Sequence, residues 1–127
     1  MQEQQLFEYA VIRVMPRVER EEFINVGVIV YCAKQKFLQA LFTVNEQRLQ
    51  IFCCALDLEE VEDHLYAFQR ICSGDTTSGP IARLDAASRF RWLTAMRSTV
   101  LQTSRVHPGF CKDAGEKLQE LFKHLVL

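Results

Sequence analysis

The sequence predicts a single α+β domain in which a mostly antiparallel sheet of three to four strands, beginning with a β-meander, carries helices on one face. β-Branched and aromatic residues are concentrated in the first third of the chain, where three strand-like segments follow one another. Later segments combine capping residues with apolar residues at helical spacing. With 127 residues, 49% of them apolar and 24% charged, the chain is expected to form one globular domain over residues 1–127.

The three N-terminal strands are predicted from apolar runs and their boundaries. The first covers 6–15 and ends at Pro16, because proline cannot donate to a strand ladder. The second, 23–32, is almost continuously apolar, which predicts burial on both faces and a central position. Gly27 within it predicts either a bulge or the close approach of another group. A short polar connection leads to a third strand, 37–44, so the second and third strands should form an antiparallel hairpin.

Two helices are predicted after these strands. Asn45 can cap a short helix that extends to about Cys54. Asp57 with Glu60 forms a variant capping box and opens a longer helix that should end near Gly74.

The C-terminal third alternates between helix and strand. Asp85 is a possible cap for a helix within 84–97, although residues 90–92 would also fit the alternation of a strand. Residues 98–106, rich in Ser, Thr and Val, predict a fourth strand. The segment 107–109, His-Pro-Gly, is expected to turn. Asp113 should open the last helix through a second variant capping box.

Composition excludes several classes of function. The formal net charge of −1 provides no general attraction to nucleic acid or to an anionic membrane, so neither is expected as a partner. No apolar run approaches the roughly 20 residues that span a bilayer, and the polar N-terminus does not resemble a signal peptide, which predicts a cytoplasmic protein. Phosphate-loop, dinucleotide, HExxH and EF-hand motifs are absent from the sequence, so no cofactor and no metal site is predicted.

The cysteines do not form a recognisable framework. Their number is odd, two are adjacent and no CxxC motif occurs, which argues against both a disulfide scaffold and a zinc knuckle. We expect reduced and mostly buried thiols, with no role assigned to the adjacent pair beyond packing. The five residues are Cys32, Cys53, Cys54, Cys72 and Cys111.

The first candidate site is the charged segment before the second strand. Its carboxylates and arginines could act in acid–base chemistry, or they could form a solvated turn that pairs with itself. Asn25, inside the apolar strand, needs hydrogen-bond partners if it is buried, either in the charged turn or in a ligand. The ligand-binding candidates here are Arg20 and Asn25, and the catalytic candidates are Glu21 and Glu22.

The second candidate site is an arginine block with a single acid, Asp85. Guanidinium groups bind phosphates and carboxylates, so this arginine-rich patch could receive an acidic partner or an anionic small ligand. It could equally pair with the acidic helix start at 57–63. Trp92 could stack on a ligand or lie in the core. The block contains Arg83, Arg89, Arg91, Arg97 and Arg105, and the binding candidates are Arg89, Arg91, Trp92, Arg97 and Ser98.

His107 is the third candidate. A histidine on a turn after a strand is well placed for proton transfer, and with Glu21 or Glu22 it would provide an acid and a base. The nearby serines and threonines lack a GxSxG motif or any spacing that specifies a triad. His107 could instead stabilise a turn through hydrogen bonds.

An ordered set of short motifs resembles the bacterial domain-of-unknown-function 3037 family over nearly the whole chain. These motifs are residues 9–16, 19–29, 79–81, 89–95, 97–98 and 107–109. That family has no established activity. Because its members are often encoded beside HipA-like kinase genes, the resemblance implies a small subunit with a protein partner, for which such a kinase is a candidate.

Two functions therefore remain open. The first is a non-catalytic interaction or regulatory subunit that presents the arginine block to an acidic partner or a phosphate-bearing ligand. The alternative is a small hydrolytic or phosphoryl-handling enzyme that uses His107, Glu21 or Glu22 together with arginines. The enzyme requires these residues to share one pocket.

Overall fold

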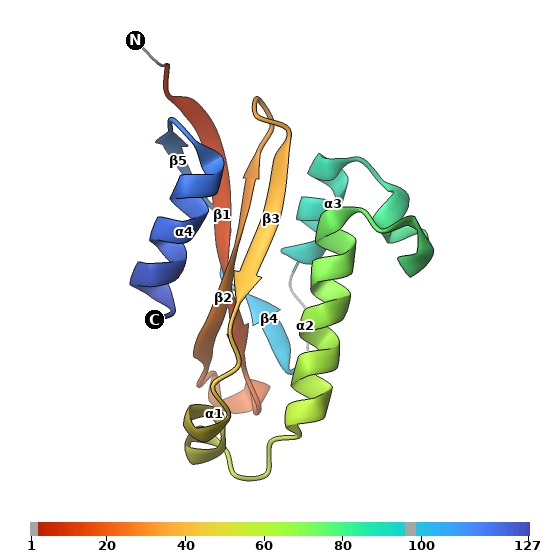
Figure 1. Ribbon diagram of the computed structural model, residues 1–127. Helices are drawn as coiled ribbons and strands as arrows, with labels where there is room; N and C mark the ends of the chain where they lie inside the picture. The colour runs from red at the N-terminus through yellow and green to blue at the C-terminus, as the bar shows by residue number, and fades with distance from the viewer. Residues whose placement is uncertain (1–2, 96–98) are drawn as a thin grey trace.

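The computed structural model describes residues 3–95 and 99–127. These residues fold into an antiparallel sheet of five strands and the helices that pack on it (Figure 1). Along the sheet the order is β3, β2, β1, and the far edge of β1 pairs with both β4 and β5. The first three strands make the predicted meander. The strands are β1 Gln5–Val14, β2 Ile24–Cys32, β3 Phe37–Phe42, β4 Leu101–Thr103 and β5 His107–Cys111.

Each α-helix begins at the capping residue that the sequence predicts. Side-chain oxygens of Asn45, Asp57, Asp85 and Asp113 accept hydrogen bonds of 2.8–3.2 Å from backbone N–H groups in the first turn. Gly74 ends α2 at φ +75°, a conformation that favours glycine. The helices are α1 Glu46–Phe52, α2 Leu58–Ser73, α3 Ala86–Leu93 and α4 Ala114–Leu125, with short 3₁₀ turns η1 Val18–Arg20, η2 Thr76–Ser78 and η3 Ile81–Arg83.

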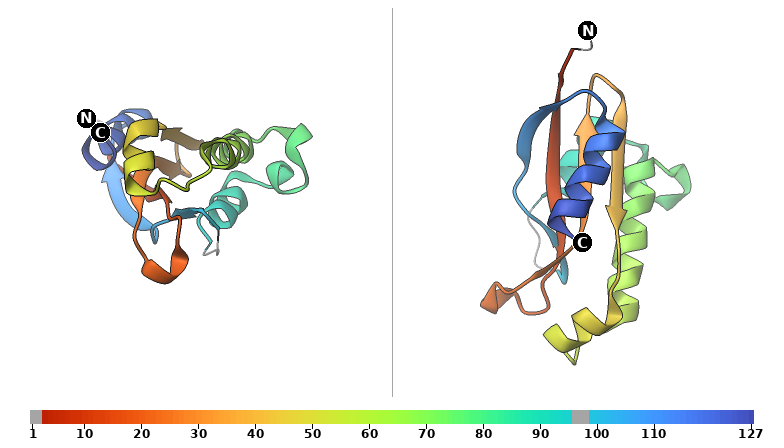
Figure 2. Two further views of the ribbon diagram at one scale, coloured as in Figure 1. Left: turned by 90° about the horizontal axis from the view of Figure 1, so that it is seen from below. Right: turned by 60° about the vertical axis from the view of Figure 1, so that its left-hand side comes forward.

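The α+β class is confirmed, but the helices cover both faces of the sheet rather than one. Figure 2 shows α4 on one side and the pair α2 and α3 on the other. Val28 and Val30 of β2 pack in the cluster with α4, whereas Ile29 packs in the cluster with α2 and α3. The prediction that β2 is buried on both faces is therefore confirmed. This burial arises because helices cover each side of the sheet.

The predicted turn at residues 107–109 is wrong, because these residues open strand β5. Pro108 is tolerated because β5 is an edge strand. Gly109 lies against the ring of Phe7, where a Cβ would come within 2.8 Å of the nearest ring carbon. The predicted strand at 98–106 is reduced to the three residues of β4, and residues 96–98 lie outside the described part of the chain.

Gly27 fulfils both expectations. The register between β1 and β2 is irregular next to it, at Ile12 and Arg13. A Cβ on Gly27 would lie 2.5 Å from the carbonyl oxygen of Leu41 on β3. The absence of a side chain therefore lets β3 approach β2 at this position.

Candidate functional site

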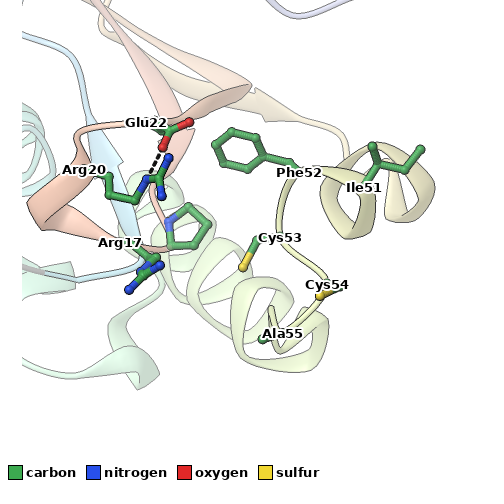
Figure 3. Close-up of a pocket in the computed structure, with 9 residues that line it drawn as sticks. Arg17, Arg20, Glu22, Ile51, Phe52, Cys53, Cys54 and Ala55 are labelled. Carbon is green, nitrogen blue, oxygen red and sulfur yellow. Dashed lines mark hydrogen bonds and ion pairs between the residues drawn. The ribbon is translucent and has the colours of Figure 1, made fainter.

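A pocket of about 350 Å³ lies between the loop that connects β1 with β2 and the segment that follows α1 (Figure 3). We call it the thiol pocket. The connecting loop supplies two arginines and a glutamate, and the opposite wall supplies both adjacent cysteines. Its lining residues are Pro16, Arg17, Arg20, Glu22, Ile51, Phe52, Cys53, Cys54 and Ala55.

The charged loop is exposed and paired with itself, as one of the two interpretations of the sequence predicts. Arg17 Nε lies 3.1 Å from Glu19 Oε1, and Arg20 pairs with Glu22. Exposed pairs of this kind contribute about 0–1 kcal/mol each, so a ligand can displace them at little cost. Glu21 is exposed at φ +54° in the same turn.

Asn25 has a partner that the sequence did not predict. Its Nδ2 donates to the carbonyl of Leu125 at 3.1 Å, which ties β2 to the end of α4 rather than to the charged loop. Arg13, its register partner on β1, stacks its guanidinium 3.9 Å from the ring centroid of Phe23. Partial burial lowers the pKa of Arg13. Asn25 Oδ1 and Arg13 Nε are buried without a hydrogen-bond partner among the described residues.

A second hollow, of about 420 Å³, lies where β3 meets α2 and α3, and we call it the β3 groove. Its lining residues are Lys36, Leu38, Gln39, Ala40, Gln69, Cys72, Ser73, Ala86 and Arg89. Two of them are basic, and none of the lining residues is acidic. The groove therefore presents positive charge beside an outer strand of the sheet.

Arg89 forms part of the groove wall and also closes the end of α2. Its Nη1 donates to the carbonyls of Ile71 and Cys72 at 3.1 and 2.9 Å, and its Nε donates to Leu84 at 3.0 Å. The Ile71 carbonyl also accepts from the N–H of Gly74 at 3.1 Å, whereas Arg89 supplies the donor for the Cys72 carbonyl at the helix end. The guanidinium is consequently fixed in position.

The remaining arginines of the block are dispersed. Arg83 donates to the carbonyl of Thr76 at 3.3 Å, and none of the ion pairs between described residues joins the block to the acidic start of α2. Arg91 and Arg105 are exposed. Arg97 and Ser98 lie outside the described residues.

Trp92 does not lie in the core. The residue is 38% exposed, so the core interpretation of Trp92 is wrong. It lines a third hollow of about 260 Å³ with His64 and Thr103. The ring is therefore accessible on the surface of α3.

The structure does not bring His107 to the glutamates. His107 opposes Tyr9, with ring centroids 5.2 Å apart, whereas Glu21 and Glu22 precede the strand end where Ile24 opposes Val14. The five residue-to-residue steps from Tyr9 to Val14 span about 16 Å of strand. A shared acid–base site at these positions would need hydrogen-bond reach or one bridging water. His107 and the two glutamates therefore do not form the acid–base site that the enzyme hypothesis requires.

Residues 3–95 and 99–127 contain no cluster of three or more His, Cys, Asp or Glu residues suited to a metal ion. No helix in these ranges has the length and apolar character needed to cross a bilayer.

No curated protein and no solved structure matches the chain. A family model does match, over residues 9–126, which is nearly the full length. The chain therefore belongs to the family described as "Protein of unknown function (DUF3037)".

Proposed function

We propose that this protein is a non-catalytic, cytoplasmic interaction subunit that binds an extended acidic segment of a protein partner along the open edge of β3. The observation that carries the proposal is a basic groove beside an outer strand. Lys36 and Arg89 line the groove, and no acidic residue among the lining residues offsets their charge. An acidic segment is the complementary occupant.

The backbone of β3 provides the second half of the argument. The N–H of Thr43, just beyond β3, donates to the carbonyl of Val26 at 2.8 Å. In an antiparallel pair every second residue directs its N–H and C=O toward the neighbouring strand, so residues 41, 39 and 37 also direct theirs toward β2. Leu38, Ala40 and Phe42 therefore direct theirs outward. Leu38 and Ala40 also line the groove. An extended peptide could pair with these groups by strand addition while its side chains meet the basic residues.

A labelled peptide of alternating valine and aspartate tests the proposal by fluorescence anisotropy at low salt. Peptides of equal length with serine or lysine in place of aspartate are the charge controls. We expect the acidic peptide to bind at least about threefold more tightly than the serine peptide, since each exposed ion pair contributes up to about 1 kcal/mol. The lysine peptide should bind more weakly than either, and added salt should weaken the acidic complex.

Matched variants locate the binding surface. Lys36→Glu and Gln69→Glu place a carboxylate at the groove, whereas Lys34→Glu and Gln119→Glu make the same changes at exposed positions outside it. The first two should weaken binding severalfold, and the second two should not. In an NMR titration the amides of Leu38, Ala40 and Phe42 should shift and become protected. Equal affinity for all four variants, or shifts confined to another face, would refute the proposal.

A further inference from the structure

The thiol pocket shares no residue with the β3 groove, and its chemistry is not used by the proposed function. Cys53 is half-buried and Cys54 is exposed. Figure 3 shows the Cys53 sulfur projecting across the pocket toward the side that holds Arg17. The pocket thus combines an accessible thiol, a cavity and charged side chains.

The two cysteines are poorly placed to oxidise to a disulfide with each other. Adjacent Cα atoms joined by a trans peptide are about 3.8 Å apart, whereas ordinary disulfides span about 4.4–6.8 Å. All described peptide bonds are trans. The other three cysteines, Cys32, Cys72 and Cys111, are buried. A disulfide partner for Cys53 would therefore come from outside the chain.

The opposite wall indicates the charge of that partner. Arg17 and Arg20 offer two guanidinium groups, and Glu22 offers one carboxylate. Both arginines are held only by exposed ion pairs, which a ligand can replace at small cost. Two carboxylates and one ammonium group would complement this wall. A volume of about 350 Å³ is in the range of small-molecule sites.

We propose that Cys53 is a site of reversible mixed-disulfide formation with a low-molecular-weight thiol of the glutathione type, which carries two carboxylates and one ammonium group. The oxidant is the corresponding symmetrical disulfide. Cys53 loses its proton to solvent, and the thiolate attacks one sulfur of that disulfide. The external S–S bond breaks as the Cys53–S–S bond forms, and the departing thiolate takes up a proton. Excess reduced thiol reverses the exchange.

The test measures rates of modification by intact mass and peptide mapping. Glutathione disulfide is compared with cystamine, whose halves carry only an ammonium group. Each rate on the native protein is divided by the rate on the same protein unfolded in urea, which removes differences in intrinsic reactivity. The variant Cys54→Ser leaves Cys53, and Cys53→Ser leaves Cys54 as the matched control.

We expect Cys53 in the Cys54→Ser variant to favour glutathione disulfide over cystamine by about threefold to tenfold after normalisation, a range set by two exposed ion pairs. The additional changes Arg17→Gln and Arg20→Gln should reduce this preference toward one. Cys54 in the Cys53→Ser variant should show a smaller preference. Absence of a preference at Cys53, insensitivity to the arginine changes, or adducts that form only at Cys54 would overturn the proposal. Peptide binding at the β3 groove is unaffected by any of these outcomes.

Discussion

Ser104 satisfies both backbone groups of Val11. Its N–H donates to the Val11 carbonyl, and its Oγ accepts from the Val11 N–H, each at 2.8 Å. The hydroxyl group in turn donates to the carbonyl of Arg105 at 2.9 Å. Ser104 lies between β4 and β5, so its side chain supplies the acceptor that an uninterrupted strand would have provided from its backbone. The backbone N–H and C=O of Val11 therefore keep hydrogen-bond partners where β4 has ended and β5 has not yet begun.

Replacing Ser104 with Ala should destabilise the protein by about 1–3 kcal/mol, because the N–H of Val11 would be buried without an acceptor. Urea unfolding measures the change. Ser73→Ala removes an exposed hydroxyl that donates to Arg70 and should cost less than about 0.5 kcal/mol. Equal stability of the two variants would show that the hydroxyl of Ser104 is not needed.

Prediction from sequence failed at this edge of the sheet, where β1 pairs with β4 and β5. The caps of all four helices and the first three strands follow from local patterns, and all were predicted. His107 and its two neighbours carry the composition of a turn, but a proline and a glycine are compatible with an edge strand. They pair instead with β1, about one hundred residues earlier in the sequence, where Gly109 lies against the ring of Phe7. No local pattern reports such a contact.

At the candidate sites, too, local features were predictable from the sequence and contacts between distant segments were not. The charged loop was predicted as a site, and Arg20 and Glu22 do line a pocket. Cys53 and Cys54 were assigned only to packing, because nothing in their neighbourhood reveals that the segment after α1 faces that loop. Arg89 was predicted to be a ligand-binding residue, but its bonds to the end of α2 depend on how two helices pack. In both cases the contacts between elements far apart in the sequence could not be predicted from local sequence patterns.

Gly27→Ala should destabilise the protein by about 1–3 kcal/mol or more, because the added methyl group would meet the backbone of β3 rather than a side chain that could move. Thermal unfolding and the NMR shifts of the Leu41 and Phe42 amides measure the effect. An unchanged melting temperature together with unchanged shifts would mean that β3 can move away without cost.

The five thiols should separate into two classes. Burial raises the pKa of Cys72 to about 12, so at about pH 8 only about one molecule in ten thousand carries its thiolate. Burial also raises the pKa of Cys111, and Cys32 is buried as well. With Ellman's reagent, Cys53 and Cys54 should react in the folded protein, and the other three should react only after unfolding. Rapid reaction of a third thiol would contradict this burial pattern.

The cap of α3 should make stability depend on acid. Hydrogen bonds from Ser88 lower the pKa of Asp85, so the stabilisation is complete above its ordinary value and is lost as the pH falls below about 4. Asp85→Asn keeps a side-chain acceptor but cannot ionise. The variant should unfold at a lower temperature than the wild type at neutral pH, and the difference should shrink at about pH 3. A constant difference across this range would show that ionisation of Asp85 contributes nothing.

Arg89 and Arg91 should differ sharply, although they are two residues apart on α3. Arg89→Met removes the donor of the Cys72 carbonyl and the second donor of the Ile71 carbonyl, and it should cost about 1–3 kcal/mol. Arg91→Met changes an exposed side chain and should cost less than about 0.5 kcal/mol. Hydrogen exchange in the last turn of α2 should accelerate in the first variant alone. If it does, a loss of peptide binding on substitution of Arg89 reflects a displaced groove wall as well as a lost charge. For that reason Lys36 and Gln69, which make no comparable internal bonds among the described residues, are the positions that isolate the contribution of charge.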